Sequence, residues 1–232
     1  MSHKKIQSRH NSQEQTRKLV MLALFTAVAY LSIYIIHFRV SFLTFEFKNV
    51  FITIAAMLFG PVAGGVISLI TAYLEMVFFS TTDFYGFIMN FISSASFSMI
   101  AAYIYRGRRT QISSYVSLAV ATLSSTALML VANLIVTPFF MGTTMTEVAL
   151  LIPKMIFPFN LIKCIANAAL VLLFYKPITV VLRRAKMIPG EEKNKAYFNH
   201  RTLLSIIVAC ALMVISFVVL FLALDGSIVF GK

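Results

Sequence analysis

At residues 158–167 the chain reads Pro158-Phe159-Asn160-Leu161-Ile162-Lys163-Cys164-Ile165-Ala166-Asn167, which sets a lysine and two asparagines inside an otherwise apolar run. Asn160, Lys163 and Asn167 fall on one face of a helix because they are three and four residues apart. An ammonium group inside a membrane-length helix costs about 2.5 to 3.5 kcal/mol, so such a residue usually faces the protein interior and marks a functional site. The alternative is a lysine that extends along its helix to the nearer membrane interface.

The composition of the chain is that of an integral membrane protein. Of 232 residues, 59% are hydrophobic and 12% charged, and the mean hydropathy is +0.88. These values predict an all-α protein that crosses the membrane several times. The net charge of +12 would suggest nucleic acid as the partner of a soluble protein, but here the basic residues lie in the gaps between apolar runs. We therefore expect a lipid bilayer and no nucleic acid.

The cysteines and histidines give no sign of a metal site or of a cofactor. Cys164 and Cys210 lie inside apolar runs without metal-binding spacing, and only His37 of the four histidines borders a predicted span. No metal ligand, catalytic residue or cofactor is expected.

Seven apolar runs are predicted to form transmembrane helices, at residues 19–38, 49–60, 62–79, 86–105, 113–138, 156–182 and 203–224. The second run is short for a perpendicular crossing of about 30 Å and meets the third at Gly60-Pro61, a helix stop and restart. Residues 39–48 are expected to form an ordered loop at the far surface, and a second loop is expected to carry Glu147 and Lys154.

Four segments describe the predicted organisation of the chain. A cytoplasmic N-terminal tail (1–18) precedes a six-helix substrate-binding membrane domain (19–185). A cytoplasmic linker (186–202) then leads to an additional transmembrane helix with a short outer tail (203–232).

Charge predicts the orientation of the chain. When successive segments are assigned alternately to the two sides, one side receives fifteen of the twenty basic residues but only three of the eight acidic ones. By the positive-inside rule that side is cytoplasmic, so the N-terminus is predicted to be cytoplasmic in a multi-pass protein of the cell membrane.

This orientation gives four polar residues a common depth. Glu75, Asn90, Asn133 and Lys163 each lie four or five residues from the outer end of a predicted helix. At 1.5 Å per residue they are about 6 to 8 Å below those ends. We infer a polar pocket that opens outward beneath residues 39–48. Glu75 is expected to act as a counter-ion for Lys163 or as an acceptor for a ligand.

Several motifs along the chain resemble those of one transporter family. They are Val40-Ser41-Phe42-Leu43-Thr44-Phe45-Glu46, Leu58-Phe59-Gly60-Pro61, Met89-Asn90-Phe91, Asn133 with Thr137-Pro138, and Pro158-Phe159-Asn160-Leu161-Ile162-Lys163. In this order and spacing they resemble the S components of energy-coupling factor (ECF) vitamin transporters, specifically the riboflavin-binding type, over residues 15–185.

The resemblance implies a fold, partners and site residues. It implies six helices around a vitamin pocket near the outer face of a bacterial plasma membrane, capped by the first loop. It also implies a transmembrane coupling protein and two cytoplasmic ATPases as partners. Asn133, Asn160 and Lys163 match the positions that contact riboflavin in the family, and Thr44 and Phe45 match a further contact through their backbone. Ala23 and Ala27 match the small-residue pair that docks on the coupling protein.

Asn90, Glu75 and Asn167 are added to the predicted substrate site only because of their positions on the predicted helices. The family resemblance implies no role for Glu75. The seventh run, 203–224, lies outside the six-helix pattern.

Other readings of the sequence remain open at this point. The vitamin could be a different one, since S components share one fold across substrates. A stand-alone carrier would use Glu75 and Lys163 as an ion relay. A membrane enzyme would need a clustered nucleophile, base or metal site that the spans lack, so we expect no enzyme. A helix-packing scaffold would leave the polar layer without a purpose.

Overall fold

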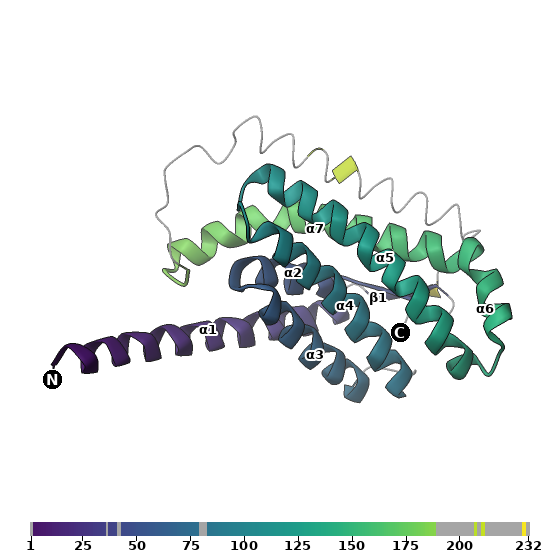
Figure 1. Cartoon of the computed structure of the whole chain (residues 1–232), viewed down its shortest axis with the longest axis horizontal. Helices are drawn as coiled ribbons and strands as arrows, with labels where there is room; N and C mark the ends of the chain where they lie inside the picture. Colours follow the sequence, from purple (N-terminus) through teal and green to yellow (C-terminus); the bar gives the residue numbers. More distant parts are fainter. Residues whose placement is uncertain are drawn as a thin grey trace.

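The computed structural model describes residues 2–35, 37–40, 43–78, 83–188, 207, 210–211 and 229–230, and most of the predicted seventh span lies outside these residues. The elements, in chain order, are α1 (Ser2–Ile35), β1 (His37–Val40), β2 (Leu43–Glu46), α2 (Lys48–Phe59), α3 (Pro61–Phe78), α4 (Asp83–Tyr105), α5 (Gln111–Met141), α6 (Met145–Leu151), the π-helical turn η1 (Ile152–Ile156), α7 (Phe157–Arg184) and β3 (Val229–Phe230) (Figure 1).

The described part of the chain is a helical bundle, which confirms the predicted all-α membrane fold. Five of its helical segments are long and apolar enough to cross a membrane, and α2 is a shorter apolar helix. Nine of the twelve residues of α2 are buried, because α1, α3, α4 and α7 all pack against it. A short helix is tolerated within a membrane bundle because these neighbours, rather than lipid, cover most of its residues.

The predicted break at Gly60-Pro61 is confirmed. Gly60 ends α2 with φ of 105°, a conformation that residues with a side chain rarely adopt, and its N–H donates to the carbonyl of Ala56 at 2.8 Å. Pro61 then opens α3, where its missing N–H costs no hydrogen bond.

Gly64 lets α2, α3 and α4 approach closely. A Cβ atom at this position would lie 2.7 Å from the Cβ of Ala56 on α2 and 3.0 Å from the Oγ of Ser98 on α4. Both distances are too short for a side chain, so the packing of these three helices depends on glycine here.

The segment expected to be an ordered loop at residues 39–48 is a β-hairpin that continues directly into α2. β1 pairs antiparallel with β2, with Phe38 opposite Phe45, and β3 pairs with the other edge of β1. Lys48 was expected at the loop surface. This is wrong, because Lys48 opens α2 and is 1% exposed.

Residues 145–156 are helical rather than the expected loop. Thr144 and Glu147 form a capping box in which each side chain bonds the backbone of the other, and this starts α6. The π-helical turn then connects α6 to α7 without a break. At the other end of the chain, α1 extends back through the predicted N-terminal tail to Ser2.

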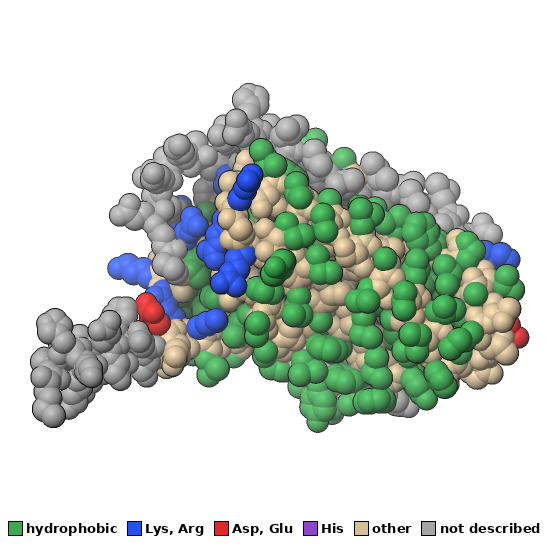
Figure 2. Space-filling model, in the orientation of Figure 1, with side chains coloured by type: hydrophobic (Ala, Val, Ile, Leu, Met, Phe, Trp, Pro, Cys, Tyr) green, Lys and Arg blue, Asp and Glu red, His purple; other side chains and the backbone are tan. Residues whose placement is uncertain are grey.

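The surface of the bundle has an apolar middle and a basic end. Figure 2 shows hydrophobic side chains over the flank of the helices and basic side chains at the end away from α6. The exposed basic residues at the ends of α4 and α7 are Arg106, Arg108, Arg109, Arg183, Arg184 and Lys186.

Candidate functional site

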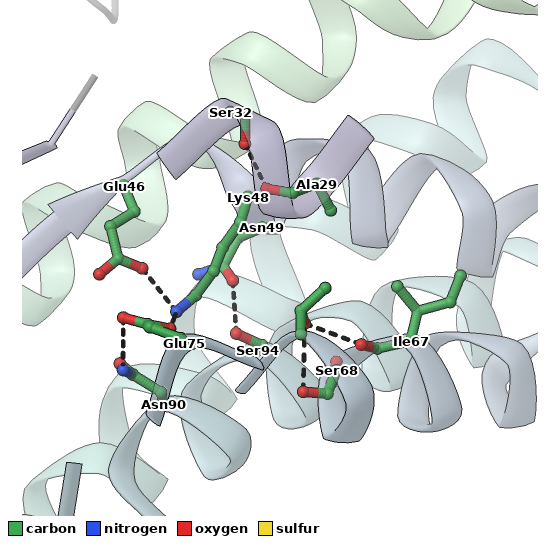
Figure 3. Close-up of polar contacts among 11 residues, drawn as sticks. Ala29, Ser32, Glu46, Lys48, Asn49, Ile67, Ser68, Glu75, Asn90 and Ser94 are labelled. Carbon is green, nitrogen blue, oxygen red and sulfur yellow. Dashed lines mark hydrogen bonds and ion pairs between the residues drawn. The ribbon is translucent and has the colours of Figure 1, made fainter. Parts of the chain in front are cut away.

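A buried ion cluster lies where β2, α2, α3 and α4 meet (Figure 3). The Nζ of Lys48 donates a hydrogen bond to Oε2 of Glu75 and lies 2.6 Å from Oε2 of Glu46. The other carboxylate oxygen of Glu75, Oε1, accepts a hydrogen bond of 2.8 Å from Nδ2 of Asn90. Lys48 therefore joins two carboxylates, and Glu75 is held through both of its oxygens.

The local fold explains how these side chains meet. β2 ends at Glu46 and α2 begins at Lys48, so only Phe47 separates the two charged residues. Glu75 lies in the last turn of α3, and Asn90 lies in the second turn of α4. Consecutive helices that pack against each other bring the end of one close to the start of the next, which places Asn90 beside Glu75.

Burial makes the pairing of these charges necessary. The exposed fractions of Glu46, Lys48 and Glu75 are 0%, 1% and 4%. Removing one partner of a buried ion pair costs about 3 to 5 kcal/mol, because a charge is then left without compensation. Burial alone would raise the pKa of the Glu46 carboxyl, but the positive charges of Lys48 and Lys163 hold that pKa below its usual range. Glu46 is therefore an anion at neutral pH.

Lys163 on α7 belongs to the same electrostatic environment. It is 7% exposed, and it interacts electrostatically with Glu46, Lys48 and Glu75. Of the four residues predicted to share one depth, Glu75 and Asn90 are in direct contact, and Lys48 is the direct ion partner of Glu75. The pocket that would join them to Asn133 and Lys163 stays a prediction.

The polar face predicted for residues 158–167 is the buried face of α7. Asn160, Lys163 and Asn167 are 3%, 7% and 1% exposed, so the lysine does not extend to a membrane interface. The amide oxygen of Asn167 is buried and has no hydrogen-bond partner within the described part of the chain. Such an oxygen can accept a hydrogen bond from a ligand or from water.

Two asparagine amides are held in place by their own helices. Nδ2 of Asn133 donates to the carbonyl of Met129 at 2.7 Å, and Thr137 donates to Oδ1 of Asn133 at 3.1 Å. Nδ2 of Asn160 donates to the carbonyl of Ile156, the last residue of the π-helical turn, at 2.8 Å. π-helical turns are frequent at functional sites, and here the turn fixes the first amide of the α7 face.

The remaining predicted residues lie on β2 and α1. Thr44 and Phe45 are on β2, and their side chains lie outside the described residues. Ala23 and Ala27 are on the exposed face of α1. This small-residue pair is therefore available to a partner rather than used for packing within the chain.

The sequence does not predict Lys48 as a site residue, and Glu46 enters the sequence analysis only as part of a motif. The available signal was a glutamate and a lysine two residues apart, immediately before the apolar run of α2. Charges at such a junction are usually solvated, so only the tertiary structure identifies this pair as buried.

Comparisons with known proteins agree on one family. The family model of the ECF transporter substrate-specific component matches residues 17–175. The riboflavin transporter RibU of Staphylococcus aureus (strain TCH60) is 30% identical over 182 residues, which cover 75% of this chain and 96% of the relative. A solved structure of the S component of a bacterial ECF transporter matches with a TM-score of 0.63 and 30% identity, over 73% of this chain and 99% of that one.

The matched family and relative are transporters, so the chain is a membrane transport protein rather than an enzyme. More particularly, the chain belongs to the substrate-specific, or S, components of ECF transporters. This confirms the resemblance drawn from the helix motifs.

Proposed function

We propose that this protein captures riboflavin outside the cell and delivers it through an ECF transporter. The observation that carries the proposal is the 30% identity to a riboflavin transporter over three quarters of the chain. The asparagines and the lysine expected from the resemblance are also buried in the bundle, at Asn133, Asn160 and Lys163.

The chemistry of the site suits this ligand. Riboflavin has a planar ring system with imide and carbonyl groups and a chain of hydroxyls. Asn133, Asn160 and Asn167 offer amide donors and acceptors, and Lys163 offers three donors. Glu75 and Asn90 complete the polar wall, and the backbone at Thr44 and Phe45 would close the site from the hairpin side.

The proposed partners are a transmembrane coupling protein and two cytoplasmic ATPases. The sequence contains no GxxxxGK[ST] phosphate-binding loop, so energy from ATP would have to come from another subunit. Ala23 and Ala27 would dock on the coupling protein, because small residues on an exposed helix face allow another helix to approach closely.

The proposed orientation puts the basic end of the bundle and the N-terminus in the cytoplasm. It is supported by the exposed arginines at the ends of α4 and α7. Residues 19–185 would then form the substrate-binding domain, with 186–202 as a cytoplasmic linker and 203–224 as a further crossing.

An uptake assay tests this function. Bacteria that cannot synthesise riboflavin would express the chain with or without a coupling protein and its two ATPases, and accumulation of labelled riboflavin would be measured. We expect uptake only with all the subunits, and competition by riboflavin but not by thiamine, biotin or folate.

Two other outcomes would overturn the proposal. Uptake without the ATPases that stops when ion gradients are dissipated would indicate an ion-coupled carrier. Competition by a different vitamin alone would indicate an S component of another specificity.

A further inference from the structure

Lys48 stands at the junction between the hairpin and the helical bundle. Its ammonium group contacts Glu46 at the end of β2 and Glu75 in the last turn of α3. Glu75 is in turn bonded to Asn90 on α4. Lys48 thus connects the strand β2 directly to α3, and through Glu75 to α4 (Figure 3).

The position of Glu46 gives this contact a consequence for the hairpin. Glu46 is the last residue of β2, two positions beyond Thr44 and one beyond Phe45, the proposed ligand contacts. Its carboxylate is fully buried, so β2 is fixed to the bundle at the end nearest those residues. If the hairpin moves away from the bundle, Glu46 must leave the ammonium group of Lys48.

The charges explain why Lys48 is needed for this attachment. Glu46 and Glu75 are both close to Lys48, and their negative charges repel each other unless a cation lies near both. Lys163 interacts with the same carboxylates from α7, but we have proposed it as a ligand contact. Lys48 is therefore the cation that can hold the two carboxylates together whether or not a ligand is bound.

We infer that Lys48 is a positioning residue that fastens the β1–β2 hairpin to the bundle through Glu46 and Glu75, and so controls how readily the site opens. For its effect on ligand release the inference rests on the proposed function, whereas its effect on the hairpin can be measured without ligand. No contact between Lys48 and the ligand is required.

The test measures how fast the hairpin becomes accessible. Thr44→Cys is introduced into the full chain with Cys210→Ser, since Cys210 is exposed and Cys164 is buried. The rate at which a water-soluble maleimide labels this cysteine is then measured in ligand-free protein in detergent or nanodiscs. We expect Lys48→Met to raise the labelling rate at least tenfold.

A matched control separates hairpin attachment from general stability. Ser94 donates a buried hydrogen bond of 2.6 Å to Asn49 and so links α4 to α2 one residue away from Lys48, and neither Ser94 nor Asn49 belongs to the hairpin. Ser94→Ala should lower the unfolding temperature but leave the labelling rate near the wild-type value. Equal acceleration in Ser94→Ala and Lys48→Met, or no acceleration in Lys48→Met, would overturn the inference.

A second variant covers the case in which Lys48→Met does not fold. Glu46→Gln keeps the shape of the side chain and the contact between Lys48 and Glu75, and it removes only the negative charge on the hairpin side. It should also speed labelling. An unchanged labelling rate in Glu46→Gln would contradict the inference by itself.

Ligand release provides an independent readout. Riboflavin dissociation from Lys48→Met and Glu46→Gln, with Thr44 intact, should be faster than from the wild type by a similar factor, and dissociation from Ser94→Ala should not. If the wild type binds no riboflavin, the proposed function fails, but the labelling experiment still decides whether Lys48 fastens the hairpin.

Discussion

Two lysine side chains, Lys48 and Lys163, lie buried within the bundle. Lys48 contacts both Glu46 and Glu75, and Lys163 interacts electrostatically with the same two carboxylates. An isolated charge at such a position would cost several kcal/mol, and the carboxylates near each lysine offset part of that cost. A ligand that binds beside Lys163 therefore meets donors that the protein has already oriented.

Lys163→Met tests the proposed role of this lysine. The change removes the charge and the three donors at nearly constant side-chain length. A hydrogen bond to a charged group contributes about 1.5 to 3 kcal/mol, so riboflavin affinity should fall about 10- to 100-fold. Titration followed by quenching of flavin fluorescence measures the change.

The control for this variant is Lys154→Met. Lys154 is exposed on the π-helical turn, so the same substitution there should leave affinity unchanged. If Lys163→Met bound riboflavin as tightly as the wild type did, Lys163 would not be a ligand contact.

The site depends on the close packing of α2, α3 and α4, because α3 carries Glu75 and α4 carries Asn90. Gly64→Val would force a side chain against Ala56 and Ser98. Overpacking of this kind costs about 1 to 3 kcal/mol, so the unfolding temperature should fall. The unfolding temperature is measured with a thiol-reactive dye that reacts with the buried Cys164 when the protein unfolds, in a Cys210→Ser background.

Gly107→Ala provides the matched control for that substitution. Its added Cβ would meet only the carbonyl of Ile104, at an ordinary distance of 3.7 Å. We expect little change in unfolding temperature for Gly107→Ala. An equal effect of the two substitutions would show that the α2–α3–α4 contact is not the cause.

The strand β3 adds a third member to the hairpin sheet through Val229 and Phe230. Deletion of residues 226–232 should therefore raise the hydrogen exchange rate of backbone amides at Phe38 and Arg39 in β1. Mass spectrometry of peptides that cover β1 measures this rate, with peptides from α5 as the internal reference. Unchanged exchange in β1 would indicate that β3 does not protect the hairpin.

Some elements were predictable from local sequence and others were not. The break at Gly60-Pro61 and the polar face of α7 follow from residue types and spacing, and the structure has both. The capping box at Thr144 and Glu147 was also a local signal, but the polar residues beside it favoured a loop. The burial of Lys48 was not predictable, because it depends on Glu75, which lies 27 residues further along the chain.

At the scale of the whole molecule, charge and apolar surface divide the bundle. Basic side chains gather at one end, whereas Glu46, Lys48, Glu75 and Asn90 lie together where the hairpin meets the bundle (Figures 2 and 3). An apolar flank beside a basic end suits a protein that spans a membrane. Within this apolar surface, α1 exposes the small residues Ala23 and Ala27.

Ala23→Leu with Ala27→Leu tests the proposed docking surface on α1. Larger side chains at these exposed positions should keep the coupling protein from approaching, so copurification with the coupling protein and ATPases and riboflavin uptake should both be lost. Riboflavin binding by the isolated chain should not change, because neither residue lies in the candidate site.

Ala119→Leu with Ala127→Leu is the control for this double variant. Both alanines are exposed on α5, so the two substitutions add the same volume to another part of the surface. Assembly should be retained in the control. If both double variants assembled with the partners equally well, α1 would not be the docking surface.

The central claim is that this chain binds riboflavin, and the most direct test is a titration of the purified protein. Absorbance would first show whether a flavin copurifies, and the ligand-free protein would then be titrated in parallel with riboflavin, thiamine, biotin and folate. We predict tight binding of riboflavin alone, with quenched flavin fluorescence. A colourless protein that does not bind riboflavin but binds another vitamin would contradict the claim.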